Sequence, residues 1–230
     1  MARLESPVLP PFLYRYRRLS EDRLQQEIES IENKFLWCAN YKDMNDPMEG
    51  FYKPSRRFEK VTRFEKAAQK IYDIKQTVGI CSFTDTHNNE IMWTHYADNY
   101  RGICIGYRPK SLIAGLPENA RLARLGYGVA PPEVGVHEGV IPGEAARKIL
   151  SHKKASWEYE REWRVFGPCG QLYFARQCVA ELRLGVRISD FHKGELLDHF
   201  AQTPIRIYQM TVTNYEHHWR HLNPVDQNKT

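Results

Sequence analysis

Three carboxylates occur at every second position of residues 157–166, and alternating acids are a pattern that can do chemistry. In an extended segment Glu158, Glu160 and Glu162 would share one face with Arg164, because side chains alternate along a strand. Acids on one face repel one another unless a cation or a chemical task lies opposite them. The pattern therefore indicates a solvated strand face, a divalent-metal site or a catalytic centre.

Basic residues gather in a second segment. Residues 53–75 contain eight basic and three acidic residues, and this excess equals the formal net charge of +5 for the whole chain. A basic helix can contact phosphates, so the segment predicts a nucleic-acid surface made by Arg56, Arg57, Lys60 and Arg63. The alternative is an ordinary solvated helix face.

Several common sites are absent from the sequence. It contains no GxGxxG, GxxxxGK[ST], HExxH or GxSxG, and no PCxxC follows His137-Glu138. Rossmann, P-loop, zincin, α/β-hydrolase and zinc-deaminase sites are therefore unsupported. His217, His218 and His221 lack a carboxylate partner in helical register, so they indicate a surface cluster, and no metal is expected.

Composition describes an ordinary globular protein. The chain has 230 residues, of which 42% are hydrophobic and 27% charged, which fits one domain. No apolar run approaches the roughly 20 residues that cross a bilayer, and the N-terminus lacks the apolar core of a signal peptide. No membrane partner is therefore expected. Five widely spaced cysteines without a CxxC pair favour a reduced, cytoplasmic compartment.

Hydrophobic periodicity predicts the elements that position these residues. Strands are expected at 12–17, 34–39, 78–84, 102–107, 120–127, 157–166, 179–186 and 205–212. Helices are expected after Ser20 and at 55–76, 90–97, 143–157 and 189–202, with a loop over 128–142. Residues 1–11 read as an irregular lead-in, 12–222 as a single α+β domain with a mixed, split β core and flanking helices, and 223–230 as a flexible tail.

The order of several short motifs resembles an uncharacterised bacterial domain family. The motifs are Leu13 to Arg17 (LYRYR), Asn45 to Glu49 (NDPME), Cys81 to Phe83, Met92 to Ala97 (MWTHYA), Gly102 to Gly106, and Lys153 to Arg164 with the pattern Kx₃WxxExEWR. The resemblance spans about residues 12–210. The sequence departs at Met48, where the family pattern more often has Phe, and the family name carries no function.

A second resemblance is to the ADP-ribosyltransferases, through an Arg on the first strand, a Ser on a middle strand and Glu-x-Glu on a late strand. It implies a split β core with NAD, the substrate, bound in a cleft. Cleavage of the NAD glycosidic bond generates an oxocarbenium-like ribose, which a carboxylate stabilises. By similarity, Glu162 would take this role and Glu160 would orient or deprotonate the acceptor. The pair Glu158 and Glu160 fits the same spacing.

The same resemblance implies cofactor-binding roles for residues outside the acidic segment. Arg15 would hold a phosphate or ribose, and Ser82 would support the ribose or hold the glutamate. Tyr14, Tyr16, Trp93 and Tyr96 would stack on nicotinamide or adenine, although aromatic residues at such spacings are also ordinary core.

Substrate-binding roles are expected for Asn45, Asp46, His95, Lys153 and Arg164. Turn formation also explains Asn45 and Asp46, and a structural histidine also explains His95. Lys153 and Arg164 would neutralise the glutamates or a phosphate, and Lys153 and Trp157 would share one helix face.

The sequence thus predicts an enzyme that transfers ADP-ribose from NAD to an unknown macromolecular acceptor, with nucleic acid as one possibility. By analogy, such enzymes in bacteria act as toxins or in phage defence. The rival hypotheses are a nucleic-acid-binding or metal-dependent nucleic-acid-processing module and a noncatalytic ligand-binding domain.

Overall fold

The computed structural model describes residues 8–222, and these fall into two compact units. Unit 1 comprises Met1–Phe35, Phe83–Leu116 and Tyr173–Thr230, and unit 2 comprises Leu36–Ser82 and Pro117–Leu172. Helices and strands are interspersed in both units, which confirms the α+β class. Most of the expected lead-in and all of the expected tail over 223–230 lie outside the described residues.

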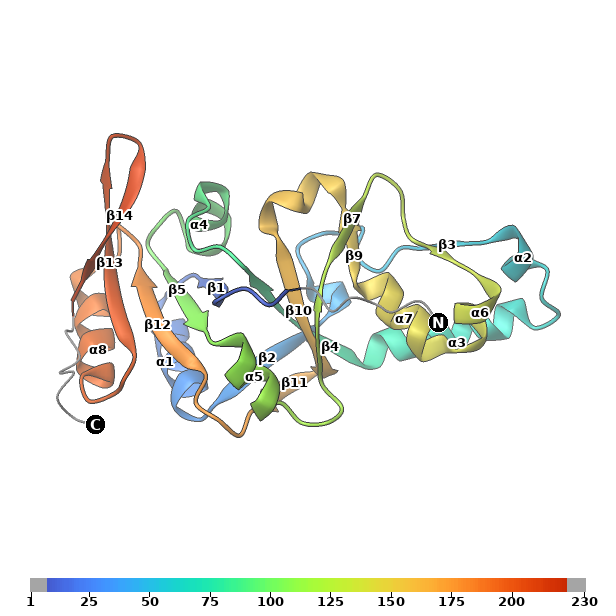
Figure 1. The fold of residues 1–230 in the computed structure, drawn as a ribbon, viewed down its shortest axis with the longest axis horizontal. Coiled ribbons are helices and arrows are strands. Elements are labelled where there is room, and N and C mark those ends of the chain that lie inside the picture. The colour runs from blue at the N-terminus through green and yellow to red at the C-terminus, as the bar shows by residue number, and fades with distance from the viewer. Residues whose placement is uncertain (1–7, 223–230) are drawn as a thin grey trace. The chain divides into compact units, whose positions relative to one another are not determined.

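Unit 1 is built on a mixed sheet (Figure 1). Its strands in spatial order are β1 (Leu13–Arg17), β5 (Ile103–Tyr107), β12 (Val179–Leu184), β13 (Arg206–Thr213) and β14 (Glu216–His221). β12 and β13 are parallel, whereas the other neighbouring pairs are antiparallel. Every residue of β5 is buried, as its apolar sequence predicts for a central strand.

The described part of unit 1 contains four helices: α1 (Glu21–Glu32), α4 (Glu90–Tyr96), α5 (Pro109–Gly115) and α8 (Asp190–Phe200). α8 connects the parallel strands β12 and β13, because parallel strands cannot be joined by a tight turn. α1 buries Leu24, Ile28 and Ile31, which are the residues that the helical spacing predicts. The side chain of Asn89 caps α4 by accepting a hydrogen bond from the Met92 backbone.

Within residues 8–222, unit 2 has more strands than unit 1, and most of them are short. The strands of unit 2 are β2 (Phe35–Asn40), β3 (Lys53–Pro54), β4 (Val78–Thr84), β6 (Arg121–Arg124), β7 (Gly126–Gly128), β8 (Glu133–Val134), β9 (His152–Lys154), β10 (Glu162–Pro168) and β11 (Gly170–Tyr173). β4 pairs with β2 and β10, β10 pairs with β6, and β2 pairs with β11. β7 and β9 form a separate parallel pair, as do β3 and β8. β4 contributes residues 78–82 to unit 2 and residues 83–84 to unit 1.

The helices of unit 2 enclose a core of their own. The elements are η1 (Tyr41–Asp43), α2 (Arg56–Glu59), α3 (Phe64–Thr77), α6 (Val136–Val140), α7 (Pro142–Leu150) and η2 (Ala155–Glu160), where η denotes a 3₁₀ helix. α3, α6 and α7 lie side by side (Figure 1). Phe58, Ile71, Val134, Ala145 and Ile149 form the buried centre of this group.

The acidic segment is not the continuous strand that the alternation predicts. Ala155–Glu160 is a 3₁₀ helix, Arg161 adopts a left-handed conformation with φ 48° and ψ 47°, and β10 begins only at Glu162. The prediction of one strand over 157–166 was therefore wrong. Glu160 and Glu162 are nevertheless both buried, whereas Glu158 is exposed.

Other element boundaries also differ from the predictions. The helix expected at 55–76 is interrupted between α2 and α3, and the helix expected at 143–157 ends at Leu150. The expected loop over 128–142 contains β8 and α6, and the strand expected at 120–127 is divided into β6 and β7. β14 carries the three clustered histidines and was not predicted. Within residues 8–222, no helix is both long enough and apolar enough to cross a membrane.

Candidate functional site

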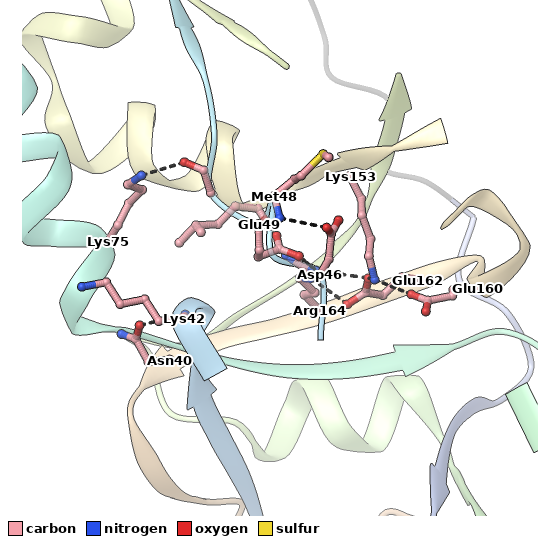
Figure 2. A network of polar contacts seen from close by, with 12 residues as sticks. Asn40, Lys42, Asp46, Met48, Glu49, Lys75, Lys153, Glu160, Glu162 and Arg164 are labelled. Atoms are coloured by element: carbon pink, nitrogen blue, oxygen red, sulfur yellow. Dashed lines mark hydrogen bonds and ion pairs between the residues drawn. The ribbon is translucent and has the colours of Figure 1, made fainter. Parts of the chain in front are cut away.

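A buried network of ionised side chains lies in unit 2 (Figure 2). It joins Arg164 and Lys153 to Glu49, Glu160 and Glu162. All five side chains are buried, so their charges are poorly screened by water. Burying charges is costly unless they are paired, and each member here has at least one partner of opposite charge.

Arg164 is the centre of the network and is completely buried, with 0% of its surface exposed. Its guanidinium donates two hydrogen bonds to Glu49, of 2.6 and 2.9 Å, and two to Glu162, of 2.7 and 3.1 Å. It donates a further bond of 2.8 Å to the carbonyl of Leu150. The planar fork of arginine suits such bidentate pairing, which a lysine cannot reproduce.

Lys153 links the two remaining carboxylates. Its Nζ lies 2.5 Å from Oε2 of Glu160 and 3.2 Å from Oε2 of Glu162. The same ammonium lies 4.7 Å from the ring centroid of Trp157. The predicted proximity of Lys153 and Trp157 is thus found, but it arises between β9 and η2 and not along a helix.

The left-handed Arg161 lies between the two glutamates that contact Lys153. It ends η2 directly after Glu160, and β10 starts at Glu162. A non-glycine residue in this region is strained, and such strain persists only where surrounding contacts impose it. The backbone N–H of Glu162 donates a 2.7 Å hydrogen bond to the hydroxyl of Tyr127, which is paired with Lys153 in the register of β7 and β9.

The segment NDPMEG presents Glu49 to the network from another part of unit 2. Oδ1 of Asp46 accepts a 2.9 Å hydrogen bond from the Met48 backbone, which closes the expected turn. Gly50 has φ 78°, and a Cβ at this position would lie 2.8 Å from the ring of Tyr41, so glycine is required. The carbonyl of Gly50 accepts a 2.7 Å hydrogen bond from the buried Lys75.

The electrostatic balance keeps Glu162 ionised. Burial alone would raise the pKa of Glu162, but the charges of Arg164 and Lys153 outweigh burial and lower that pKa below its ordinary value. The Ser82 hydroxyl also contributes to this lowering of the Glu162 pKa, although its buried Oγ makes no hydrogen bond of ordinary geometry to the described residues. Burial also opposes the charge of Arg164, but Glu162 and Glu49 raise its pKa overall.

A pocket of about 410 Å³ adjoins this network within unit 2. Its lining includes Glu49 and Lys153 of the network together with Asp46, His152 and several apolar residues. Burial lowers the pKa of His152, only partly offset by Glu49, which favours the neutral imidazole. The volume lies within the range of small-molecule sites. Glu160 and Glu162 are not among the residues that line the pocket.

The structure therefore brings together part of the predicted site. Unit 2 contains Asn45, Asp46, Ser82, Lys153, Glu160, Glu162 and Arg164. Unit 1 contains Tyr14, Arg15, Tyr16, Trp93, His95 and Tyr96. Two members of the Arg–Ser–Glu pattern, Ser82 and Glu162, are close neighbours, whereas the third, Arg15, belongs to the other unit.

The predicted cofactor residues of unit 1 pack among one another and their neighbours. Tyr14 donates a 3.1 Å hydrogen bond to Glu181, and burial, with Glu181, raises the pKa of its hydroxyl. Arg15 is buried with its guanidinium 5.7 Å from the ring centroid of Phe83. Trp93 has 0% of its surface exposed and donates a 2.9 Å hydrogen bond to the carbonyl of His87, so it serves the core. His95 is exposed, and Tyr96 is partly exposed.

The predicted nucleic-acid residues are accessible. Arg56, Arg57, Lys60 and Arg63 are all exposed, at α2 and in the short break before α3. None of them forms an ion pair with a described residue. They remain a surface that phosphates can reach.

Sequence reasoning missed three residues of the site: Glu49, Tyr127 and His152. Glu49 lies in the quoted NDPME motif but received no role, since nothing local indicates its partner 115 residues away. Tyr127 received no role, since nothing local indicates that its hydroxyl meets the backbone of Glu162, 35 residues away. The described residues contain no group of three His, Cys, Asp or Glu side chains that could hold a metal ion.

Comparison with known proteins gives one match. Residues 92–165 match the family DUF2971, whose description is "Protein of unknown function". The matched region begins at Met92 of the MWTHYA motif and ends at Val165, directly after Arg164, so it includes Lys153, Glu160 and Glu162. No curated protein and no solved structure matches the chain.

Proposed function

We propose that the pocket of unit 2 binds NAD and that the protein belongs to the ADP-ribosyltransferase class, acting on the NAD glycosidic bond. The observation that carries the proposal is the Ser82–Glu162 neighbourhood, in which a carboxylate is held ionised behind a pocket of small-molecule size. A serine beside a late-strand glutamate is what the Arg–Ser–Glu resemblance implies.

The reaction would break the bond between C1′ of the ribose and the nicotinamide nitrogen. Nicotinamide leaves with the bonding electron pair, the ribose acquires oxocarbenium character, and an acceptor nucleophile adds to C1′ and loses its proton. An anionic environment lowers the energy of that cation. The network has three carboxylates against two cations, Arg164 and Lys153, and supplies an environment of this kind.

The geometry changes the roles that the sequence gave to the glutamates. Glu160 and Glu162 are ion-paired behind the pocket wall, so we assign them to positioning and to the electrostatic field. Lys153, which reaches both the pocket lining and these carboxylates, connects the two regions. The residues that contact the substrate directly are then those that line the pocket.

One observation favours a second function, a noncatalytic ligand-binding domain. The carboxylates of Glu160 and Glu162 are both paired with cations, as expected of a structural network. This alternative predicts ligand binding without turnover. The exposed bases Arg56, Arg57, Lys60 and Arg63 favour nucleic acid as the acceptor if transfer occurs.

The test is release of nicotinamide from NAD by the purified full chain, measured by chromatography with and without added DNA, RNA or protein. We expect release that Ser82→Ala reduces, because the proposal rests on the hydroxyl of Ser82 beside Glu162. The substitution should spare the fold, since that hydroxyl makes no hydrogen bond of ordinary geometry to the described residues. Glu158→Gln, at an exposed position of the same segment, is the matched control. NAD binding without release of nicotinamide supports the noncatalytic alternative. A folded protein that neither binds NAD nor releases nicotinamide would contradict the proposal.

A further inference from the structure

Exposed apolar side chains line part of the pocket of unit 2. Met48, Phe51 and Val129 line it and are 55%, 62% and 92% exposed, respectively. Pro131 and Pro132 extend the same lining. Large apolar side chains that gather at a hollow and remain exposed commonly mark a binding site.

Asp46 is a buried polar group of the lining with an oxygen left for a ligand. Glu49 is held by Arg164 through two hydrogen bonds, and Lys153 is held by Glu160 and Glu162. Asp46 is only 6% exposed, and its Oδ1 accepts a hydrogen bond from the Met48 backbone. Among the described residues its second oxygen, Oδ2, makes no hydrogen bond. Figure 2 shows Asp46 beside Met48 and Glu49.

Asp46 forms no ion pair with another described residue. The adjoining network already has one more carboxylate than cations. His152 is favoured in its neutral form because burial lowers its pKa. Lys154 lines the pocket as well, but it is exposed and its charge is screened by water. A buried carboxylate in an apolar pocket is best satisfied by a ligand that brings a positive charge.

We infer that the pocket selects an organic cation with a flat or bulky apolar body, and that Asp46 is its counter-ion. Met48 and Phe51 would contact the apolar body while Oδ2 of Asp46 faces the charge. The inference deepens the proposed function and rests on it where the ligand is NAD. The cation of oxidised NAD is its pyridinium ring, and the reduced form of NAD lacks this positive charge.

A pair of small probes of nearly equal shape tests the inference without any reaction. N1-methylnicotinamide carries the positive charge and nicotinamide does not, and both are small enough for the pocket. Binding is measured by calorimetry and by chemical-shift changes of the full chain. We expect the cation to bind at least about tenfold more tightly than the neutral probe, which corresponds to about 1.4 kcal/mol.

The matched variants are Asp46→Asn and Asp43→Asn. Asparagine at position 46 keeps the side-chain oxygen that caps the Met48 backbone, so the turn is retained while the charge is lost. Asp43 is an exposed acid three positions earlier. We expect Asp46→Asn to remove the preference for the cation and to leave the affinity for nicotinamide unchanged, whereas Asp43→Asn keeps the preference.

The failures of the two proposals are distinguishable. Equal affinity for both probes, no binding of either, or a cation preference that survives Asp46→Asn would overturn the inference. Cation selectivity without nicotinamide release from NAD would refute catalysis and leave the cation site standing. Release of nicotinamide from NAD together with equal binding of the two probes would refute the cation site and leave catalysis standing.

Discussion

Arg164 and Glu49 form a bidentate ion pair across 115 positions of sequence, with hydrogen bonds of 2.6 and 2.9 Å and both side chains buried. The pair fixes the NDPMEG segment to β10 and therefore fixes one wall of the pocket relative to the carboxylate network. The position of Glu49 in the pocket lining therefore depends on this pair.

Removing the arginine should destabilise the protein severely. Arg164→Met leaves Glu49 without its cation and Glu162 with only Lys153, and we expect a loss of about 3–5 kcal/mol in the free energy of unfolding. Lys148→Met, which breaks the exposed 2.6 Å pair with Glu138, should cost less than about 1 kcal/mol. Urea denaturation of the two variants measures the difference. Similar costs for both variants would show that the buried pair is dispensable.

Lowering the pH should reduce the stability that the buried network gives to the fold. The pKa of Glu162 is lowered in the folded protein because Arg164 and Lys153 outweigh the effect of burial. The ionised Glu162 therefore contributes fully to folding stability at any pH above the ordinary carboxyl pKa of 4.5. This contribution is lost as the pH falls through the lower pKa that Glu162 has in the folded protein. The stability advantage of the wild-type protein over Glu162→Gln should be largest at pH 7 and shrink below pH 4.5, which denaturant titrations across pH measure.

Glu158→Gln provides the control for that pH series. Glu158 is exposed, and its side chain forms no ion pair within residues 8–222. Its substitution should leave the dependence of stability on pH nearly unchanged. A wild-type advantage over Glu162→Gln that stays constant from pH 7 to pH 3 would mean that Glu162 is not held ionised by the network.

The left-handed Arg161 gives a test of local strain. Arg161→Asn and Arg161→Val both delete the arginine side chain, but asparagine tolerates the left-handed region whereas a β-branched residue does not. We expect the valine variant to be less stable than the asparagine variant by about 1–2 kcal/mol. Thermal denaturation of both proteins is the measurement. Equal stabilities would indicate that the turn between η2 and β10 relaxes freely.

Nucleic-acid binding, if it occurs, should depend on the exposed bases of unit 2. Replacing Arg56, Arg57, Lys60 and Arg63 by glutamine should weaken binding and reduce the slope of log affinity against log salt by up to about 0.9 per lost phosphate contact. The control replaces four exposed bases of unit 1, Arg18, Arg101, Lys110 and Arg176. Filter-binding assays over a salt series measure both effects. An equal loss in both variants would indicate nonspecific attraction to net charge.

Hydrophobic patterns in the sequence predicted the helices and strands that are stabilised mainly by burial of their own apolar residues. The spacing of Leu24, Ile28 and Ile31 predicted α1, and the apolar run of β5 predicted a central strand, because burial of one face dominates each element. The alternation of glutamates was misread as one strand, because nothing in the alternation itself indicates the left-handed conformation of Arg161 that separates η2 from β10. β14 was not predicted because its histidines and charged residues leave no alternation of apolar and polar side chains.

The site was predictable only in part for a similar reason. Glu160, Glu162, Lys153 and Arg164 are close in sequence, so their relation as acids and neutralising cations could be inferred. Glu49 and Tyr127 reach the network from distant segments, and nothing in their local sequence indicates this. The unpaired oxygen of Asp46 is visible only once the partners of the surrounding charges are known.

A crystal structure of the protein soaked with NAD shows whether NAD binds in the pocket of unit 2. We expect ligand density against Asp46, Met48 and Lys153, with the positively charged ring nearest to Asp46. Density confined to unit 1, beside Tyr14 and Arg15, would contradict this expectation. So would an empty pocket in crystals where calorimetry of the same protein shows that NAD binds.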